Sequence, residues 1–340
     1  MRLLLFFLIT SMSVSAQLKG TITDIDNNPI PYVNIYIENS YEGTTSNENG
    51  DYVLALSKAG NYKIVFQFLG YKTQTSSIDI KVFPYVLDIT LFEENISLNE
   101  VVINSNENPA NRIIRSAIKN RKSKLKNINS FSADFYSKGL IRIDSLPEKF
   151  MGQEINVDIG LDSTRSGIIY LSETISKIKY QKPDKLTEKV IASKVSGNSN
   201  GFSFNSALDV NYNFYNNTIQ INSAIISPIS DYAFNYYRYK LEGVFYDDSG
   251  NLINKIKVIP RRENDPVFKG SIYIVEDQWA IFGLELKVNG SQIQLPIADS
   301  ISIKQNLTYD VNEDHWIIRS QTIGFKFRFL GFNGDGSFVA

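Results

Sequence analysis

Cysteine is absent from the 340-residue sequence, and histidine occurs once, at His315. A chain without cysteine forms no disulfide and no thiolate metal site, and it offers no cysteine for a bacterial lipoprotein anchor. A hydrolytic triad or a zinc hydrolase uses histidine as base or ligand. The single histidine lies in a polar segment beside Trp316, which favours a solvated surface side chain. We therefore expect no metal ion and no cofactor.

The sequence also lacks a charge excess and a second long apolar run. Its formal net charge is −1, which gives no support to a nucleic-acid partner. Beyond the N-terminus, no stretch approaches the roughly 18 consecutive apolar residues of a transmembrane helix. Methionine is scarce (3), whereas tyrosine (19) and phenylalanine (21) are plentiful. Together with frequent Asn, this composition favours β-structure joined by polar turns.

The N-terminus, MRLLLFFLITSMSVSAQ, has the pattern of a secretory signal peptide over residues 1–16. Arg2 precedes an apolar run from Leu3 to Ile9, and small residues lead to Ala16. The run is too short to cross a bilayer, and its ending fits signal cleavage between Ala16 and Gln17. The alternative is a buried N-terminal strand. The pattern predicts an exported protein.

Residues 17–95 contain short alternating segments separated by turn residues, which predicts a small antiparallel β-sandwich. Within it, SNENGDY concentrates Asn, Glu, Gly and Asp. An EF-hand loop with Gly50 at its sixth position would place Leu56 where the bidentate glutamate belongs, so a calcium site is excluded. Asn49-Gly50 is instead the favoured pair of a type I′ turn. It predicts a hairpin between residues 43–46 and 52–56.

A linker over residues 96–108 precedes a predicted amphipathic helix over residues 109–127. Pro109 suits the first turn of a helix, and apolar residues follow at spacings of three and four. The polar face is strongly basic, with these cations: Arg112, Arg115, Lys119, Arg121, Lys122, Lys124 and Lys126. This face is either solvated, with cations that complement the helix dipole, or a contact surface for anionic lipid head groups.

Over residues 128–340 the apolar period returns to two. Hairpin turns are expected at residues 247–251, 276–278 and 312–314. Antiparallel strands that follow one helix predict a curved antiparallel β-meander that holds the helix. Four apolar residues are expected to line a pocket in this sheet or to pack the helix as an ordinary core: Phe131, Phe135, Ile272 and Ile274.

The first module resembles the carboxypeptidase-regulatory-like domain. The resemblance rests on GTITDIDNNPIPYVNIYIENSYEGTTSNENGDYVLAL, FLGYKTQ and DITLFEENISLNEVVI. It implies a transthyretin-like sandwich of the kind that often heads outer-membrane receptors of Gram-negative envelopes. It does not imply peptidase activity.

The whole chain resembles a family of uncharacterised outer-membrane proteins in which such a domain precedes a lipoprotein-carrier-like curved sheet. The segments that carry this include NPANRIIRSAIKNR, SFSADFYSKGLIRID, SPISDYAFNYYRYKLEG and KIKVIPRRENDPVFKGSIYIVEDQW. Family members commonly continue into a C-terminal barrel, whereas this sequence stops at FKFRFLGFNGDGSFVA. The alternation of Phe325, Phe327 and Phe329 with basic residues is typical of one barrel strand. We expect a chain truncated before the barrel; the alternative is a short periplasmic relative.

These patterns predict a non-enzymatic periplasmic portion of an outer-membrane protein that acts in envelope transport or assembly by surface binding. Its expected partners are outer-membrane lipid or envelope proteins. One alternative is a periplasmic carrier that binds a lipid or hydrophobic peptide in the curved sheet. The other is a hydrolase with a carboxylate pair, for which Glu154, Asp158 and Asp162 are candidates without a supporting motif.

Overall fold

The computed structural model describes residues 17–38, 40, 42–97, 108–126, 129–150, 153–154, 161–182, 185–197, 206–208, 210, 212–310 and 315–340. The chain forms two compact units, of which the first ends at Glu94 and the second begins at Asn95. The predicted signal peptide, with Ala16, lies outside the described residues. Gln17 is the first residue of the first strand.

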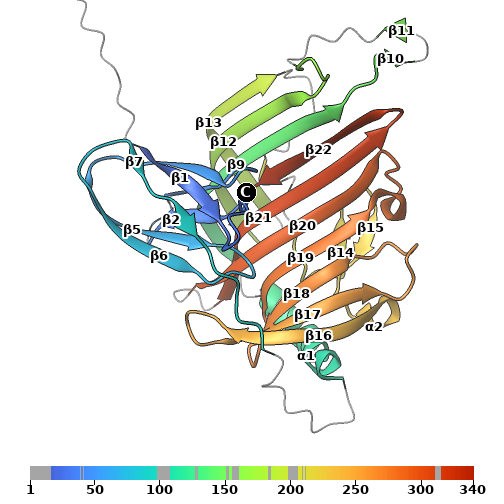
Figure 1. The fold of residues 1–340 in the computed structure, drawn as a ribbon. Coiled ribbons are helices and arrows are strands. Elements are labelled where there is room, and N and C mark those ends of the chain that lie inside the picture. Colours follow the sequence, from blue (N-terminus) through green and yellow to red (C-terminus); the bar gives the residue numbers. More distant parts are fainter. Residues whose placement is uncertain are drawn as a thin grey trace, which may run out of the picture. The chain divides into compact units, whose positions relative to one another are not determined.

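The first unit consists of two four-stranded sheets (Figure 1). One sheet contains β1 (Gln17–Thr23), β4 (Asp51–Ala55), β7 (Tyr85–Val86) and β8 (Ile89–Thr90). The other contains β2 (Asn34–Ile37), β3 (Gly43–Thr45), β5 (Gly60–Gln67) and β6 (Gln74–Ile80). Pairing is antiparallel except that β7 and β8 join β1 in parallel. Alternate side chains such as Leu18, Ile22 and Phe66 form the core between the sheets.

The SNENGDY segment forms a turn, but the predicted type I′ hairpin is wrong. The backbone N–H of Gly50 donates to the carbonyl of Asn47, and the Asn47 side chain accepts from the N–H groups of Asn49 and Asp51. Only Gly50 of this segment has a positive φ. Strands β3 and β4 belong to different sheets, so the turn carries the chain from one sheet to the other. Burial of Tyr52 and Leu54 against β1 overrides local pairing.

The second unit is built on a ten-stranded antiparallel sheet in the order β13-β12-β9-β22-β21-β20-β19-β18-β17-β16 (Figure 1). Its strands are β9 (Ser130–Ser145), β12 (Gly167–Gln181), β13 (Lys185–Gly197), β16 (Tyr237–Tyr246), β17 (Leu252–Pro260), β18 (Lys269–Val275), β19 (Ile281–Asn289), β20 (Ala298–Asp310), β21 (His315–Phe329) and β22 (Phe332–Val339). Shorter elements are β10 (Lys149–Phe150), β11 (Gln153–Glu154), β14 (Thr218–Gln220), β15 (Ala224–Ile226), α2 (Ala233–Tyr236) and a 3-10 turn at Gly290–Ile293. The predicted mainly β fold with a curved antiparallel sheet is confirmed.

The last strand, β22, lies inside this sheet, between β9 and β21. The chain runs from β9 through β12 to the edge strand β13, crosses to β16 at the opposite edge, and returns strand by strand to β22. Phe325 lies over Gly336 and Phe327 over Gly334, where an added Cβ would meet the rings. The alternation of phenylalanines therefore serves cross-strand packing in this sheet.

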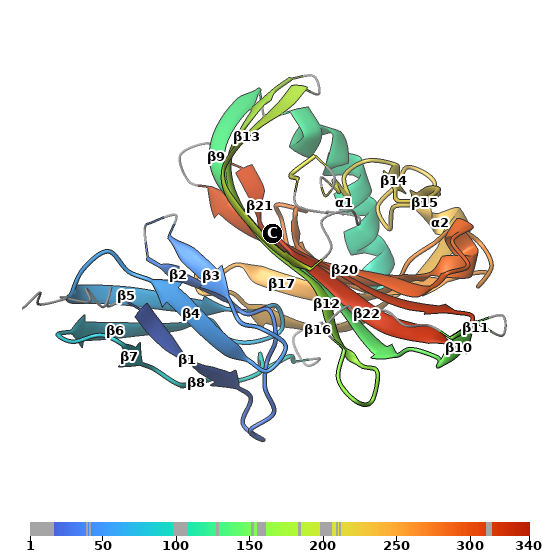
Figure 2. The same cartoon turned by 90° about the horizontal axis from the view of Figure 1, so that it is seen from above.

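The helix α1 (Pro109–Lys126) crosses the concave side of the sheet (Figure 2). The Asn108 side chain accepts a hydrogen bond from the N–H of Ala110 and so caps the N-terminus of the helix. Ala110, Ile113, Ile114 and Ala117 form its buried stripe. The prediction of a helix here is confirmed.

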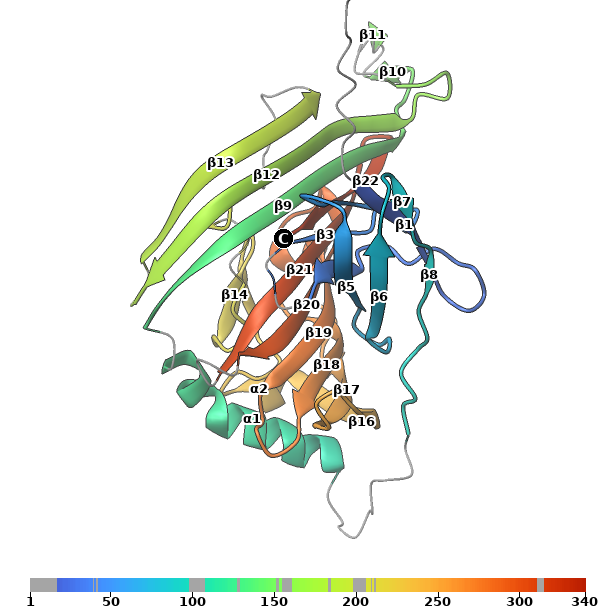
Figure 3. The same cartoon turned by 90° about the vertical axis from the view of Figure 1, so that its left-hand side faces the viewer.

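The two ends of the sheet have different inner faces. In β16–β20, which we call the core half, most buried side chains are apolar, and Ile256, Ile272 and Leu284 are fully buried. In β9, β12 and β13, which we call the arm, the buried side chains include Ser137, Ser172, Thr174 and Ser176. Figure 3 shows β13 as the outermost strand of the arm.

Candidate functional site

The edge strand β16 of the core half is covered by two chain segments. The backbone of Ser97 exchanges two hydrogen bonds of 3.0 Å with Val244. Toward the other end of the strand, the Asn108 side chain donates to the carbonyl of Tyr239 at 2.8 Å. Since the same Asn108 side chain caps α1, it ties the helix start to the sheet edge.

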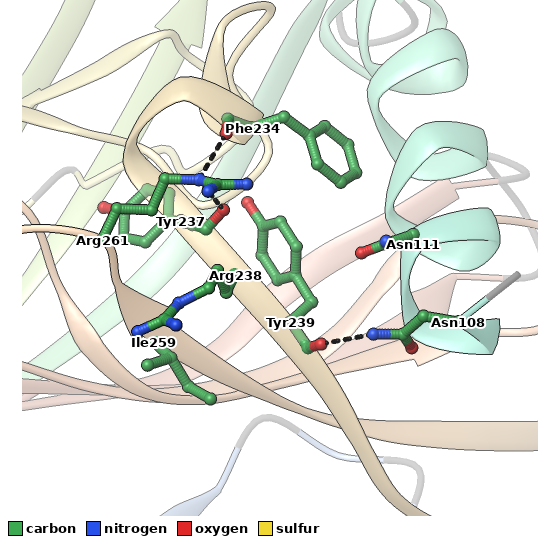
Figure 4. Close-up of a pocket in the computed structure, with 8 residues that line it drawn as sticks. All are labelled: Asn108, Asn111, Phe234, Tyr237, Arg238, Tyr239, Ile259 and Arg261. Carbon is green, nitrogen blue, oxygen red and sulfur yellow. Dashed lines mark hydrogen bonds between the residues drawn. The ribbon is translucent and has the colours of Figure 1, made fainter.

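A pocket of about 500 Å³ lies where α1 meets β16, and we call it the α1–β16 pocket (Figure 4). It is lined by residues of α1, α2, β16, β17 and the segments that flank them: Asn108, Asn111, Phe234, Tyr237, Arg238, Tyr239, Ile259 and Arg261. Two of these lining residues are arginines, and none is a carboxylate. The pocket can therefore accept an anionic group.

The Arg261 side chain has a fixed position in this pocket. Its Nε donates to the carbonyls of Phe234 and Tyr237, at 2.9 and 3.1 Å. Figure 4 shows the guanidinium directed toward Tyr239. Arg238 is exposed on β16. A guanidinium anchored by backbone carbonyls is already ordered when an anion arrives, which lowers the entropic cost of binding.

The two tyrosines of the pocket serve structure. The Tyr239 hydroxyl donates to the carbonyl of Pro228 at 2.7 Å, and the Tyr237 hydroxyl donates to the carbonyl of Ile226. Burial raises the pKa of both phenols above the ordinary value. Both side chains therefore stay neutral and hold the segment before α2 against the sheet.

The basic residues of α1 that were predicted to form one surface divide into separate environments. Arg112 forms an ion pair with Glu276 at 2.8 Å and lies over the ring of Trp279. Arg115 lies over the ring of Phe234, beside the α1–β16 pocket. Both guanidinium groups are thus engaged with neighbouring side chains. Arg115 adds positive charge beside the pocket, whereas the charge of Arg112 is compensated by Glu276.

Arg121 is buried, with 3% of its surface exposed. Its Nη2 pairs with Asp231 at 2.7 Å, and its Nη1 donates to the carbonyl of Tyr215 at 2.9 Å. Arg121 lies one turn beyond Ala117, on the stripe that faces the sheet, and this position places the cation inside. It cannot contact a lipid head group in this structure, so the expectation of a surface contact at Arg121 is corrected.

The remaining lysines of the helix differ in exposure. Lys119 and Lys122 are exposed, and Lys124 is half-buried with an interaction partner. The side chain of Lys126 lies outside the described part of the chain. Of the predicted contact set, Lys119 and Lys122 are therefore available at the surface, together with the partly engaged Arg112 and Arg115.

Side chains of β13, β20 and β21 hold described residues of the chain that precedes β14. Gln305 and Gln321 donate to the carbonyls of Tyr212 and Val210, each at 2.7 Å. Glu188 of β13 accepts hydrogen bonds from two further groups of this segment, the hydroxyl of Ser206 and the N–H of Ala207. These side-chain bonds satisfy backbone groups that would otherwise be buried without partners.

The four residues expected to line a pocket or pack a core are distributed over the sheet. Ile272 and Ile274 are fully buried in the core half. Phe131 is 41% exposed and stacks on Tyr180 at the end of the arm, and Phe135 is half-buried. The ordinary-core alternative fits the two isoleucines.

The carboxylates considered as catalytic candidates are not brought together among the described side chains. Asp158 and the side chain of Glu154 lie outside the described residues. Asp162 accepts hydrogen bonds from Thr164 and Ser166 within a turn, and these bonds lower its pKa to about 2. Within the ranges that the structure describes, no cluster of three or more potential metal ligands occurs. The helices in those same ranges are not long and apolar enough to cross a membrane.

Sequence reasoning missed Arg238 and Arg261. Arg238 alternates with Tyr237 and Tyr239 in a strand pattern, so the sequence marks it as a solvent-facing strand residue. Arg261 directly follows a strand and resembles any charged turn residue. The β16–β17 hairpin brings the two arginines together. The approach of α1 completes the pocket, and the sequence contains no signal for that approach.

The chain belongs to a family of unknown function, DUF5686, which it matches over residues 113–340, more than half of its length. Residues 18–103 match the CarboxypepD_reg-like domain. The resemblance of the first module to this domain is thereby confirmed, and the match reaches past its predicted end.

One curated relative is the TonB-dependent receptor P39 of Formosa agariphila, 34% identical over 97 residues. The match covers 28% of this chain and 9% of the receptor. Among solved structures, a putative outer membrane lipoprotein-sorting protein domain from Vibrio parahaemolyticus matches at TM-score 0.24 and 8% identity, over 67% of this chain and 90% of that chain. A LolA superfamily protein from Nitrosomonas europaea matches at TM-score 0.22 and 10% identity, with the same two shares.

Proposed function

We propose that this chain is the periplasmic portion of an outer-membrane protein and that it acts without catalysis, by binding envelope components at its surface. The observation that carries the proposal is the first module. It matches the CarboxypepD_reg-like domain, and the chain shares 34% identity over 97 residues with a TonB-dependent receptor. A receptor of that class works in the outer membrane, so the shared module supports an envelope location.

The α1–β16 pocket is the binding site within this proposal. Two arginines and two asparagines line it, without a carboxylate, and Arg115 lies beside it over Phe234. The phosphate of an anionic lipid head group is the envelope component whose charge fits these donors.

The location is tested by blotting separated envelope fractions of the native organism. The proposal expects the protein in the outer-membrane fraction, protected from protease in intact cells and cleaved after the outer membrane is opened. A band in the cytoplasmic fraction that retains its first 16 residues would overturn the location and the predicted export.

Lipid binding is tested by sedimentation of the full chain with vesicles. Vesicles with anionic phosphatidylglycerol should retain the protein, and vesicles of phosphatidylcholine alone should not. Arg238→Glu should reduce retention several-fold, because it places a negative charge in the pocket. Lys58→Glu makes the same charge change on an exposed residue of the first unit and should have no such effect. Equal losses for both variants would contradict a specific role for the pocket.

The carrier alternative has less support. The isoleucines expected to line its pocket are fully buried, and hydrogen bonds from β20 and β21 hold residues before β14 against the sheet. Extraction of the purified protein with organic solvent provides the check. A stoichiometric lipid in the extract would favour the carrier.

A further inference from the structure

Strand β13 offers an edge that no other described segment covers. In the ten-stranded sheet it pairs only with β12 among the described residues. Every side chain from Lys189 to Ser196 is exposed. At the opposite edge, Ser97 and Asn108 cover β16. An uncovered edge presents backbone donors and acceptors to which an extended segment can pair.

The three lysines of β13 lie on one face of the sheet. Lys185, Lys189 and Lys194 pair, in that order, with these β12 residues: Gln181, Lys177 and Glu173. The three partners are four residues apart along a regular strand, so their side chains share a face. The lysines opposite them share that face too.

A β-bulge produces this arrangement. Lys189 and Lys194 are five residues apart, so a regular strand would place them on opposite faces. The register of β12 against β13 shifts between Ile175 and Ser176, and Ile191 is left as the extra residue. The extra residue reverses the alternation and returns Lys194 to the face of Lys189.

The other face of the β13 edge is apolar. Val190 pairs with Ser176 and Val195 pairs with Ser172, both on the buried face of β12. The two valines nevertheless remain 56% and 42% exposed. A strand added at this edge would therefore meet lysines on one face and valines on the other.

Nearby acids on the lysine face already have partners. Asp134 pairs with Lys177 at 3.0 Å, and Glu173 pairs with Lys138 at 3.5 Å. Glu188 lies on the opposite face, where it binds Ser176. The edge lysines therefore present positive charge to an incoming strand.

We propose that the β13 edge binds an extended segment of a partner protein in which acidic residues alternate with apolar ones. The backbone of the segment extends the sheet, its acidic side chains face the three lysines, and its apolar side chains cover Val190 and Val195. A second copy of this chain fits less well, because two β13 edges would bring two sets of lysines onto one face. The same lysines therefore select against self-association and for an acidic partner. This inference goes beyond the proposed function, since it holds wherever the chain resides.

The test uses a fluorescein-labelled nine-residue peptide of alternating Glu and Val, titrated against the full chain by fluorescence anisotropy. The triple variant Lys185→Glu, Lys189→Glu, Lys194→Glu should weaken this peptide by at least about tenfold, because each change replaces attraction by repulsion. The same variant should bind a Lys–Val peptide that the unaltered chain rejects. Such an exchange of preference shows recognition by the lysine face.

Two controls separate edge pairing from general charge attraction. A Glu–Pro peptide carries the same kind of charge but lacks backbone donors at every proline, so it should bind at least about tenfold more weakly. The variant Lys58→Glu, Lys72→Glu, Lys81→Glu changes three exposed lysines of the first unit and should leave binding unchanged. Unchanged circular dichroism shows that each variant is folded. Three results would each overturn the proposal. They are equal affinity for the Glu–Pro and Glu–Val peptides, an equal loss of peptide binding in both triple variants, and a concentration-dependent dimer that the β13 variant abolishes.

Discussion

The core half and the arm of the same ten-stranded sheet are built on different chemistry. Mainly apolar side chains are buried in the core half, and its edge strand is covered at Val244 and Tyr239. Hydroxyl side chains line the arm, and its edge strand is exposed from Lys189 to Ser196. The difference indicates that the core half contributes most of the stability of the sheet and that the arm contributes its accessible surface.

The largest expected effect contrasts one core residue with one arm residue. Leu284→Ala removes a fully buried side chain from the core half and should lower the free energy of unfolding by about 3 kcal/mol. Ser172→Ala in the arm should cost about 1 kcal/mol or less, because it removes one hydroxyl interaction. Urea unfolding followed by tryptophan fluorescence reports on the second unit, which contains both tryptophans, Trp279 and Trp316. Similar losses in the two variants would contradict this difference between the halves.

A smaller effect is expected at the ion pair that joins α1 to the segment after β15. Asp231→Ala leaves the buried Arg121 without its carboxylate and should lower the free energy of unfolding by about 2 kcal/mol. The loss is smaller than for a fully buried ion pair, because Asp231 is half exposed. Arg121→Met keeps the volume and removes the buried charge, so it should cost less. Denaturant midpoints of the two variants provide the comparison. A larger loss for Arg121→Met would show that the charge is not the source of the cost.

The junction between the two halves passes through β22. Gly336→Ala should destabilise the protein by about 1–2 kcal/mol, because the new Cβ would lie 2.2 Å from the Phe325 ring and 2.8 Å from the carbonyl oxygen of Leu140. Gly324→Ala is the matched control on β21, where only the Ser302 hydroxyl lies close to the added Cβ. Thermal unfolding distinguishes them, and a control that loses as much stability would argue against packing as the cause.

The smallest effect is a pH dependence at Asp231. Burial raises its pKa, but the Asn217 hydrogen bond and the Arg121 charge outweigh burial and hold the pKa below the ordinary value. A lowered pKa contributes stability above the unfolded value, about 3.9, which is lost as the pH falls through the folded value. Stability should therefore decline below about pH 4, and less so in Arg121→Met. Parallel pH profiles for both proteins would contradict this assignment.

The sequence predicts the regular parts of the fold well. Apolar residues at period two locate the hairpins of β16–β19. The expected turn at Asp247 is confirmed, since its side chain accepts hydrogen bonds from the N–H groups of Ser249 and Asn251. The third expected turn, at residues 312–314, lies outside the described part of the chain, although its flanking strands pair. Pro109 and the apolar spacing locate α1 because both signals act within a few residues.

Long-range features escape the sequence. Asn49-Gly50 marks a turn, yet it cannot show that the flanking strands join different sheets, since core packing decides that. The charge of Arg121 suggests exposure, whereas its partner Asp231 is distant in the chain and invisible to periodicity. The bulge at Ile191 likewise depends on register with β12. Sites formed by the approach of elements that are distant in the chain, such as the α1–β16 pocket, are therefore found only in the structure.

Hydrogen–deuterium exchange of the full chain tests the comparison between the two edges most directly. We expect amides of residues 185–197 to exchange much faster than those of residues 237–246, because described segments cover only the second edge. Addition of the Glu–Val peptide should then slow exchange in β13 and leave β16 unchanged. Equal protection of both edges in the free protein would contradict the account.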